Sequence, residues 1–498
     1  MNQSQLSIWH QRAAAQICDG RAFVNGERVG ALSGASFDCV SPINGKILTN
    51  VARCDGADVD RAVAVARTAF EDKRWCGKSP TERKKILRKF SELMLQYKDE
   101  LALLETLDMG KPIKYSLSVD VPAAARCIAW YSEAIDKVYD EIAPTADNVL
   151  AMITREPVGV VAAIVPWNYP MIMAAWKIAP ALAMGNSVVL KPSEKSPLTA
   201  LRMAEIALEA GVPAGVFNVL PGYGHEAGSA LALHMDVDSI GFTGSTRVGK
   251  QIMQYAGQSN LKRVWTELGG KSPNIVCADC PDLDAAVSAA IGSIYFNQGE
   301  SCNAPSRLFV EASIKDAFTE RALKLIPQYQ PGDPLDIDTE MGAIVDQTQL
   351  NTVMGFIDAG KSEGADLLAG GNQVHTESGG YYIEPTLFSG VNAEMKIARE
   401  EIFGPVLSLL TFTDLNEAIR QANATAFGLQ AGIWTSDLRK AHQTAKALRV
   451  GTVHVNQYDG DDMTVPFGGY KQSGNGRDKS LHALEKYTEL KTTWINLG

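Results

Sequence analysis

Apolar positions along the chain follow two spacings, and the change between them divides the chain into elements. Between about residues 158 and 276, short apolar runs typical of buried strands are separated by stretches with helical apolar spacing. The predicted strands and helices cover, in chain order, Gly159 to Val165, Met171 to Met184, Asn186 to Leu190, Thr199 to Ala210, Val216 to Leu220, Ser239 to Thr243 and Val248 to Tyr255. This alternation indicates βαβ units and a parallel sheet, with ligands expected at the carboxyl ends of the strands.

The chain on either side of this region has other patterns. From Ala22 to Val51 it consists of short strands and turns, with Asn25-Gly26 as a hairpin signal. Asp58 to Phe70 carries one apolar stripe, and Ser79-Pro80-Thr81-Glu82 is a capping box that begins a further helix. A second α/β series is predicted at Leu308 to Val310, Lys315 to Ile326, Leu350 to Glu363, Val406 to Phe412 and Gly432 to Trp434. The pattern predicts an α/β protein of two or three domains, as 498 residues require.

A cysteine lies between the two series, on the turn Phe296 to Asn303. The preceding helix, Asp284 to Asn297, is stopped by Gly299, and the strand Arg307 to Val310 follows. Cys302 therefore falls where the chain changes direction. A lone cysteine is more often a small buried apolar residue than a nucleophile, so the residues around it decide its role.

Three other stretches carry groups that acyl chemistry on a thiol needs. Val165 to Pro170 ends an apolar strand and presents the amide of Asn168. Phe242 to Gly249 ends another strand in a turn of small residues that opens a helix. Glu267 to Pro273 places a carboxylate at a strand end, followed by two glycines.

Together with Cys302 and with Glu401-Ile402-Phe403-Gly404-Pro405, these stretches resemble the aldehyde dehydrogenase superfamily, in the family's order and from about residue 20 to the C-terminus. The resemblance implies a Rossmann-like parallel-sheet NAD-binding domain, an α/β catalytic domain and a small β oligomerisation arm. We assign them to residues 1–126 with 153–267, residues 268–475, and residues 127–152 with 476–498. A homo-oligomer, dimer or tetramer, is implied, in which the arm adds strands to a neighbour's sheet.

The chemistry of these residues is consistent with aldehyde oxidation. The Cys302 thiolate would add to the aldehyde carbonyl and later hold a thioester. The Asn168 amide and the backbone N–H of Cys302 would stabilise the oxyanion, and Glu267 would take a proton from the hydrolytic water. Where the family has a further glutamate after Gly-Arg, this chain has Asp478, which we leave outside the catalytic set.

The expected cofactor is NAD, with NADP as a weaker possibility. The turn after the first strand, residues 166–170, has no glycine, so a pyrophosphate would instead meet the helix that follows Gly244 and Ser245. Glu194, past the second strand, would accept hydrogen bonds from ribose hydroxyls and repel the extra phosphate of NADP. The predicted cofactor-binding residues are Trp167, Lys191, Glu194, Gly244, Ser245, Glu401 and Phe403, the last two by resemblance.

The loop Asn456 to Met463 is the candidate substrate entrance. Tyr458, with Asp459, Asp461 and Asp462, would favour a cationic tail, whereas an acidic semialdehyde would need an arginine. Met173 and Trp176, with Trp167, would form an apolar sleeve. The loop and residues 472–480 look most like bacterial γ-glutamyl-γ-aminobutyraldehyde and guanidinobutyraldehyde dehydrogenases. The alternative is a solvated acidic loop without a role in selection.

Bulk properties exclude some partners. The net charge of -10, without a basic run, argues against nucleic acid and anionic membranes. Eight cysteines in so long a chain do not form a disulfide framework, and we expect a cytoplasmic protein with reduced thiols. Cys277 and Cys280 form a lone CxxC, a weak metal signal, so no metal site is predicted.

Other functions remain open at this point. They are a broad-specificity aldehyde dehydrogenase, a CoA-acylating semialdehyde dehydrogenase, a thiol acyl-hydrolase without NAD, and a non-catalytic protein on the same fold. Glu267 disfavours the CoA-acylating enzyme, because a hydrolytic base would destroy the thioester. The hydrolase would need one of the seven histidines beside Cys302.

Overall fold

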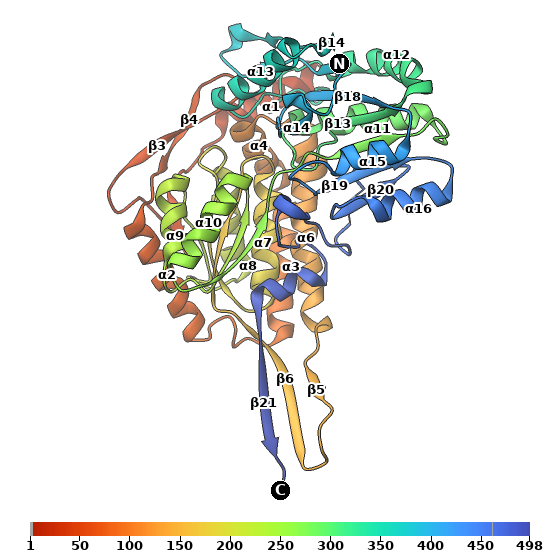
Figure 1. The fold of residues 1–498 in the computed structure, drawn as a ribbon. Coiled ribbons are helices and arrows are strands. Elements are labelled where there is room, and N and C mark those ends of the chain that lie inside the picture. The colour runs from red at the N-terminus through yellow and green to blue at the C-terminus, as the bar shows by residue number, and fades with distance from the viewer. Residues whose placement is uncertain (1–2, 461) are drawn as a thin grey trace.

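The computed structural model describes residues 3–460 and 462–498, which form two α/β units and a thin projecting sheet (Figure 1). Two seven-stranded sheets each have helices packed against them, and a three-stranded sheet extends from the body with the C-terminus at its tip (Figure 1). Within the described ranges, no helix is long and apolar enough to cross a membrane.

The first sheet has the order β11-β10-β7-β8-β9-β1-β2. Its five strands from β11 to β9 are parallel, and the β1–β2 hairpin adds to β9 in the antiparallel sense. The predicted alternation is confirmed: β7, β8, β9 and β10 are buried along their length, as expected for a parallel sheet covered on both faces, whereas β11 is buried only at its carboxyl end. The strands are β1 Ala22–Val24, β2 Glu27–Val29, β7 Val160–Ile164, β8 Ser187–Lys191, β9 Phe217–Val219, β10 Ser239–Thr243 and β11 Arg263–Glu267.

Helices cover both faces of this sheet. The predicted capping box is present, because the Ser79 hydroxyl accepts from the backbone N–H of Glu82 while the Glu82 side chain accepts from that of Ser79. Helix α7 is buried along its whole length and lies between the sheet and α6. The helices of this part are α1 Gln3–Ala15, α2 Gly56–Glu71, α3 Pro80–Gln96, α4 Lys98–Met109, α5 Ile113–Tyr115, α6 Val121–Ala134, α7 Pro170–Ala183, α8 Leu198–Ala210, α9 Ser229–Leu233 and α10 Thr246–Gln258.

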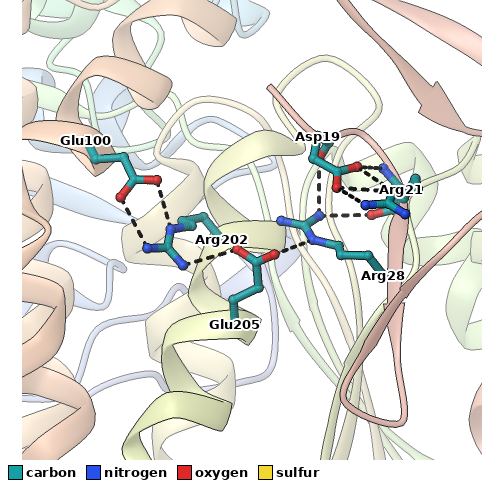
Figure 2. Close-up of polar contacts among 6 residues, drawn as sticks. All are labelled: Asp19, Arg21, Arg28, Glu100, Arg202 and Glu205. Carbon is teal, nitrogen blue, oxygen red and sulfur yellow. Dashed lines mark hydrogen bonds and ion pairs between the residues drawn. The ribbon is translucent and has the colours of Figure 1, made fainter. Parts of the chain in front are cut away.

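A chain of ion pairs ties the N-terminal hairpin to these helices (Figure 2). Arg28 of β2 binds Glu205 of α8, with Nε and Oε1 2.6 Å apart. Glu205 also meets Arg202, whose Nε lies 2.9 Å from Oε1 of Glu100 on α4. Because these pairs are partly exposed, each contributes roughly 0–1 kcal/mol, and their effect is to orient the hairpin at the sheet edge.

The second sheet has the order β14-β17-β18-β13-β12-β19-β20 and is parallel except for β14. Its strands are β12 Pro273–Val276, β13 Arg307–Glu311, β14 Asp366–Ala369, β17 Thr386–Ser389, β18 Val406–Phe412, β19 Gln430–Trp434 and β20 Thr452–Val455. Its helices are α11 Leu283–Tyr295, α12 Lys315–Leu325, α13 Gln347–Ser362, α14 Lys396–Arg399, α15 Leu415–Asn423 and α16 Leu438–Ala447. Two small two-stranded sheets pair β3 Ser36–Val40 with β4 Ile47–Ala52, and β15 Gln373–Val374 with β16 Tyr382–Ile383.

The projecting sheet has the order β21-β6-β5 and is antiparallel, with β5 Glu141–Ala143, β6 Val149–Pro157 and β21 Thr488–Asn496. Its first strand begins at Glu141, and residues 127–134 ahead of it belong to α6. Cys127, Ile128 and Tyr131 are buried there and continue the apolar stripe that packs on α3 and α7. The helical apolar spacing therefore continues past residue 127 to the end of α6.

Candidate active site

The cysteine turn is held in an uncommon backbone conformation. After α11, a short 3-10 turn runs from Phe296 to Gly299, and Asn297, Gln298 and Gly299 have φ of 50°, 57° and 70°. A Cβ on Gly299 would lie 2.2 Å from the carbonyl oxygen of Gly404. Glycine is therefore required here both for its φ and for this close approach.

Buried amides fix this turn against the strand end that carries Asn168. The Asn297 Nδ2 donates to the carbonyls of Asn168 and Glu300, at 2.9 and 3.1 Å. The Asn168 Nδ2 in turn donates to the Glu300 carbonyl at 2.9 Å. Because an amide NH₂ carries two donors, Asn168 retains a second N–H beyond this bond. Asn168 thus lies beside the chain that leads into Cys302.

Glu267 ends β11 and is 2% exposed. Its Oε1 has no hydrogen-bond partner within the described part of the protein. Burial, with a contribution from Asp478, raises the pKa of Glu267 to about 8. Burial also raises the pKa of the Cys302 thiol well above its usual range, and the Glu267 carboxylate adds to this effect. The acid and the thiol therefore lie within electrostatic reach, each favouring its protonated form at neutral pH.

The two glycines after Glu267 bring Glu401 close to the cysteine loop. A Cβ on Gly270 would lie 2.3 Å from the Cys302 carbonyl oxygen, and one on Gly269 would lie 2.1 Å from Oε2 of Glu401. The Gly270 N–H donates to Oε1 of Glu401 at 3.0 Å. Burial raises the pKa of Glu401 to about 7. Any side chain at either glycine would displace one of these groups.

Most of the remaining residues predicted to bind cofactor follow strands of the first sheet. Because β7, β8 and β10 are parallel neighbours, Trp167, Glu194 and Ser245 leave the sheet at the same edge. Ser245 caps α10, its hydroxyl accepting from the Val248 N–H at 3.3 Å, and Gly244 precedes it. Lys191 is buried, with its Nζ 3.2 Å from Oε2 of Glu194.

Trp167 also meets the second unit of the protein. Its ring contacts that of Phe403 edge-on, with centroids 5.2 Å apart at 84°. Phe403 has a φ of 57°, and its carbonyl accepts from Nε2 of Gln349 at 2.7 Å. The Trp167 and Phe403 pair therefore spans the junction between the two α/β units.

Cys302 opens into a cavity of about 500 Å³. The predicted substrate residues Met173, Trp176 and Asp459 line it, together with Tyr169 and Phe467. This volume is typical of small-molecule sites, and the lining is largely aromatic and apolar.

Two other predicted residues of this loop, Tyr458 and Asp462, are not in the lining of the cavity. Tyr458 is buried and its hydroxyl donates to the Asn303 carbonyl at 2.8 Å, so it supports the cysteine loop from outside the lining. Asp462 is exposed and its carboxylate accepts from the N–H and hydroxyl of Thr464. Asp461 lies outside the described residues.

A hydrogen-bonded chain that the sequence analysis missed connects the cavity wall to the cysteine loop. The Tyr169 hydroxyl lies 3.2 Å from that of Ser301, which donates to Oδ1 of Asn303 at 2.6 Å. The Asn303 Nδ2 donates to Oδ1 of Asp459 at 2.6 Å. Tyr169 directly follows Asn168 and Ser301 directly precedes Cys302, so adjacency to the predicted residues was the available signal.

Lys479 is a second missed cavity residue. It is buried in the cavity wall, and its Nζ lies 5.6 Å from the Trp176 ring centroid and 5.8 Å from that of Phe467. Its neighbour Asp478 is buried with Lys177, 2.5 Å away, and with Lys486. Burial alone would raise the pKa of Asp478, but the two ammonium groups hold it below the usual value.

Comparison with known proteins identifies the family. The model of the aldehyde dehydrogenase family matches residues 30–493. The chain belongs to the aldehyde dehydrogenase family. Its members oxidise aldehydes with a nicotinamide cofactor, so this aldehyde dehydrogenase is an oxidoreductase, and its mixed α/β sheets have the fold that the sequence predicts.

Several relatives are similar over the full length. The NADP/NAD-dependent aldehyde dehydrogenase PuuC of Escherichia coli K12 is 53% identical over 100% of both chains. An indole-3-acetaldehyde dehydrogenase from P. syringae, solved with NAD⁺ and IAA, is 61% identical over 99% of both chains with a TM-score of 0.98. A γ-glutamyl-γ-aminobutyraldehyde dehydrogenase from Burkholderia cenocepacia J2315 is 60% identical over 99% of this chain and 100% of that one, with a TM-score of 0.97.

We predict that turnover of this aldehyde dehydrogenase rises with pH through about 8, the pKa of Glu267. The reason is that Glu267 accepts a proton only when ionised, and ionisation becomes complete above its pKa. Glu267→Gln removes the titrating group, so kcat falls by about 10²–10⁴-fold and the rise through this pH range is lost. Both effects are measured as steady-state kcat between about pH 6 and 10. This range extends to either side of the raised pKa of the Glu267 carboxyl.

The matched control is Glu417→Gln, which changes an exposed glutamate on α15 in the same way. It should leave the pH profile of the parent in place. A Glu267→Gln protein that retained the kcat and the pH profile of the parent would show that another group is the base.

Proposed function

We propose that this aldehyde dehydrogenase oxidises ω-amino or ω-guanidino aldehydes of polyamine and arginine breakdown, including γ-glutamyl-γ-aminobutyraldehyde and 4-guanidinobutyraldehyde. The observation that carries the proposal is that the Cys302 thiol and the Asp459 carboxylate face one cavity. A carboxylate there attracts an ammonium, a guanidinium or an amide N–H of a substrate tail. The similarity to the Burkholderia cenocepacia enzyme, named for γ-glutamyl-γ-aminobutyraldehyde, supports the same assignment.

Cys302 is the proposed nucleophile. Its thiolate adds to the aldehyde carbonyl, and the resulting tetrahedral carbon carries the hydrogen that leaves as hydride. The Asn168 amide and the Cys302 backbone N–H would donate to the oxyanion, and losing one such donor typically raises a barrier by about 2.7–4 kcal/mol. Loss of hydride re-forms the carbonyl and leaves a thioester on Cys302.

Glu267 is the proposed base for the second half of the reaction. Ionised Glu267 removes a proton from water, the hydroxide adds to the thioester carbonyl, and the carboxylic acid leaves as the Cys302 thiolate is released. The same carboxylate is the acceptor for the thiol proton before the first step, directly or through water. Its burial beside Cys302, without a partner for Oε1 among the described residues, suits both transfers.

NAD is the proposed cofactor and, when bound, accepts the hydride. The N-terminus of α10 at Gly244 and Ser245 would hold the pyrophosphate, because free backbone N–H groups there favour an anion. Lys191 and Glu194 would bind the adenosine ribose. Trp167 and Phe403 would pack near the nicotinamide, and Glu401 would hydrogen-bond its ribose.

The proposed assembly is a homo-oligomer, a dimer or a tetramer. Both β21 of the arm and β20 of the second sheet are edge strands in the isolated chain. Leu490 and Trp494 of β21 are exposed apolar residues, and an unpaired edge of this kind favours strand addition from a second copy.

We retain the division into residues 1–126 with 153–267 for NAD binding, 268–475 for catalysis, and 127–152 with 476–498 for assembly.

The proposed location is the cytoplasm. All eight cysteines in the described part of the chain are free, which suits a reducing compartment.

A second candidate substrate class is favoured by the aromatic lining of the cavity, Tyr169, Trp176 and Phe467. It consists of aromatic aldehydes, in keeping with the name of the P. syringae relative.

We expect the parent enzyme to convert γ-glutamyl-γ-aminobutyraldehyde and 4-guanidinobutyraldehyde with a higher kcat/KM than hexanal, succinic semialdehyde or indole-3-acetaldehyde. Asp459→Asn should reduce that advantage by about tenfold, because a charged hydrogen bond contributes about 1.5–3 kcal/mol. The measurement is NADH formation for each aldehyde, with and without CoA. Rates that do not change with CoA support hydrolysis of the thioester by water.

Asp462→Asn tests whether substrate selectivity comes from the carboxylate in the cavity lining or from the overall negative charge of the loop. It removes an acid of the same loop outside the lining, so its loss of selectivity should be smaller than that of Asp459→Asn. Hexanal or indole-3-acetaldehyde as the best substrate would refute the amino-aldehyde proposal and favour the broad or aromatic alternative.

We also expect Glu194→Ser to lower the preference for NAD over NADP by about tenfold or more. The carboxylate that would repel the 2′-phosphate is removed, and a like-charge contact of this kind costs more than about 1.4 kcal/mol. Quenching of protein fluorescence by each nucleotide in the absence of aldehyde gives the two Kd values independently of turnover. An unchanged ratio would mean that Glu194 does not face the ribose.

A further inference from the structure

A buried ion pair lies behind the wall of the cavity. Lys111 follows the end of α4, and its Nζ lies 2.7 and 2.8 Å from the two carboxylate oxygens of Asp120. Both side chains are 0% exposed, and neither lines the cavity. Removing two charges from water costs free energy, and apolar residues of similar volume often replace such a pair without loss of stability. Stability alone is therefore a weak reason for this pair to lie here.

A third charged residue, Glu105 of α4, lies within electrostatic reach of the pair and is also buried. Burial raises the pKa of Glu105 well above its usual value, and the Asp120 carboxylate adds to this effect. Burial raises the pKa of Asp120 as well, but the Lys111 ammonium and its hydrogen bonds act against it. The region therefore contains a protonated Glu105 beside one cation and one anion.

The ammonium of Lys111 has a second contact, with the ring of Tyr169. Its Nζ lies 4.1 Å from the ring centroid. A ring face attracts a cation within about 6 Å, and more strongly where water is excluded. Tyr169 lies between β7 and α7 and lines the cavity. Lys111 thus contacts a residue of the cavity wall from within the protein.

The Tyr169 hydroxyl extends this contact to the cysteine loop. It lies 3.2 Å from the hydroxyl of Ser301, the residue directly before Cys302. Ser301 also donates to Oδ1 of Asn303, directly after Cys302. The position of the Tyr169 ring therefore bears on both neighbours of the nucleophile.

Asp120 connects the same ammonium to a second part of the wall. It ends a π-helical turn, Ser116–Asp120, and Tyr115 directly before this turn lines the cavity. Such turns are rare and occur frequently at functional sites. The Tyr115 ring contacts that of Phe296 edge-on, with centroids 4.9 Å apart, and Phe296 begins the cysteine turn. The two partners of Lys111 therefore lead to the two ends of the cysteine turn.

We propose that Lys111 is a positioning residue for the nucleophile, which fixes Tyr169 and the π-helical turn and, through them, the loop that carries Cys302. It acts through these neighbours and does not touch substrate. A displacement of about 1 Å at a reacting group costs up to about 10²-fold in rate, so such a support affects turnover. This inference rests on the proposed role of Cys302.

The test replaces the pair by apolar residues, Lys111→Met with Asp120→Leu, so that no unpaired charge remains buried. Tyr169→Phe keeps the ring and removes only its hydroxyl, and a further protein combines all three changes. The matched control is Lys324→Met with Glu320→Leu, which treats an exposed ion pair of α12 in the same way.

The readouts separate positioning from folding and from substrate binding. They are kcat and KM from NADH formation with propanal and with 4-guanidinobutyraldehyde, the Kd of NAD from fluorescence quenching, and Tm. Two aldehydes of different size and charge are used so that the result does not depend on which substrate class the enzyme prefers.

We expect the paired change to lower kcat by about tenfold or more for both aldehydes, because the thiol is displaced. KM, the Kd of NAD and Tm should change far less. Tyr169→Phe should also lower kcat, and the loss in the combined protein should be smaller than the product of the two separate losses, because residues that share one contact are not additive. The control should keep the values of the parent.

Two results would overturn the inference. An unchanged kcat in the paired variant would show that the nucleophile does not need Lys111, and a rise in KM for the larger aldehyde alone would assign the pair to cavity shape. If the paired variant does not fold, Asp120→Asn keeps the volume and removes the anion, and an unchanged kcat there has the same meaning. Retained turnover in Cys302→Ala would instead refute the proposed nucleophile.

Discussion

The left-handed turn from Asn297 to Gly299 is the constraint on which the active site depends. Two of its three residues are not glycine, and each such residue in this region costs roughly 1–3 kcal/mol. Buried amide bonds from Asn168 and Asn297 to neighbouring carbonyls offset that cost. The turn therefore exists only where the end of β7 is folded against it. Cys302 is positioned by both α/β units at once.

Close backbone packing extends this arrangement to the acids. Gly269 and Gly270 leave room for the Glu401 side chain and for the Cys302 carbonyl. The Glu401 carboxylate, the Cys302 thiol and Glu267 at the end of its strand are therefore buried close together. Desolvation raises the pKa of all three groups and stabilises their neutral forms. Glu267, with a pKa of about 8, is then partly ionised just above neutral pH and can take a proton from water, whereas the Cys302 thiol, whose pKa is raised well above its usual range, favours its protonated form.

The sequence was sufficient for the architecture and for the surroundings of the nucleophile. The apolar alternation predicted both parallel series, and strand ends of a parallel sheet share an edge, so Trp167, Glu194 and Ser245 lie there together. The cavity was harder to predict. Asp459 and Lys479 have φ of 64° and 60°, and nothing in the local sequence signals left-handed backbone at an aspartate or a lysine. Adjacent residues therefore diverge: Asp459 faces the cavity while Tyr458 supports Asn303.

The most direct test of the account is the intact mass of Glu267→Gln protein after incubation with NAD and 4-guanidinobutyraldehyde, followed by acid quenching. Glu267→Gln slows thiolate formation as well as hydrolysis, so the incubation must outlast a single turnover. The account then predicts a mass increase of one guanidinobutyryl group per chain, lost when Cys302→Ala is added. An unmodified mass while NADH accumulates would contradict a thioester on Cys302 hydrolysed by Glu267.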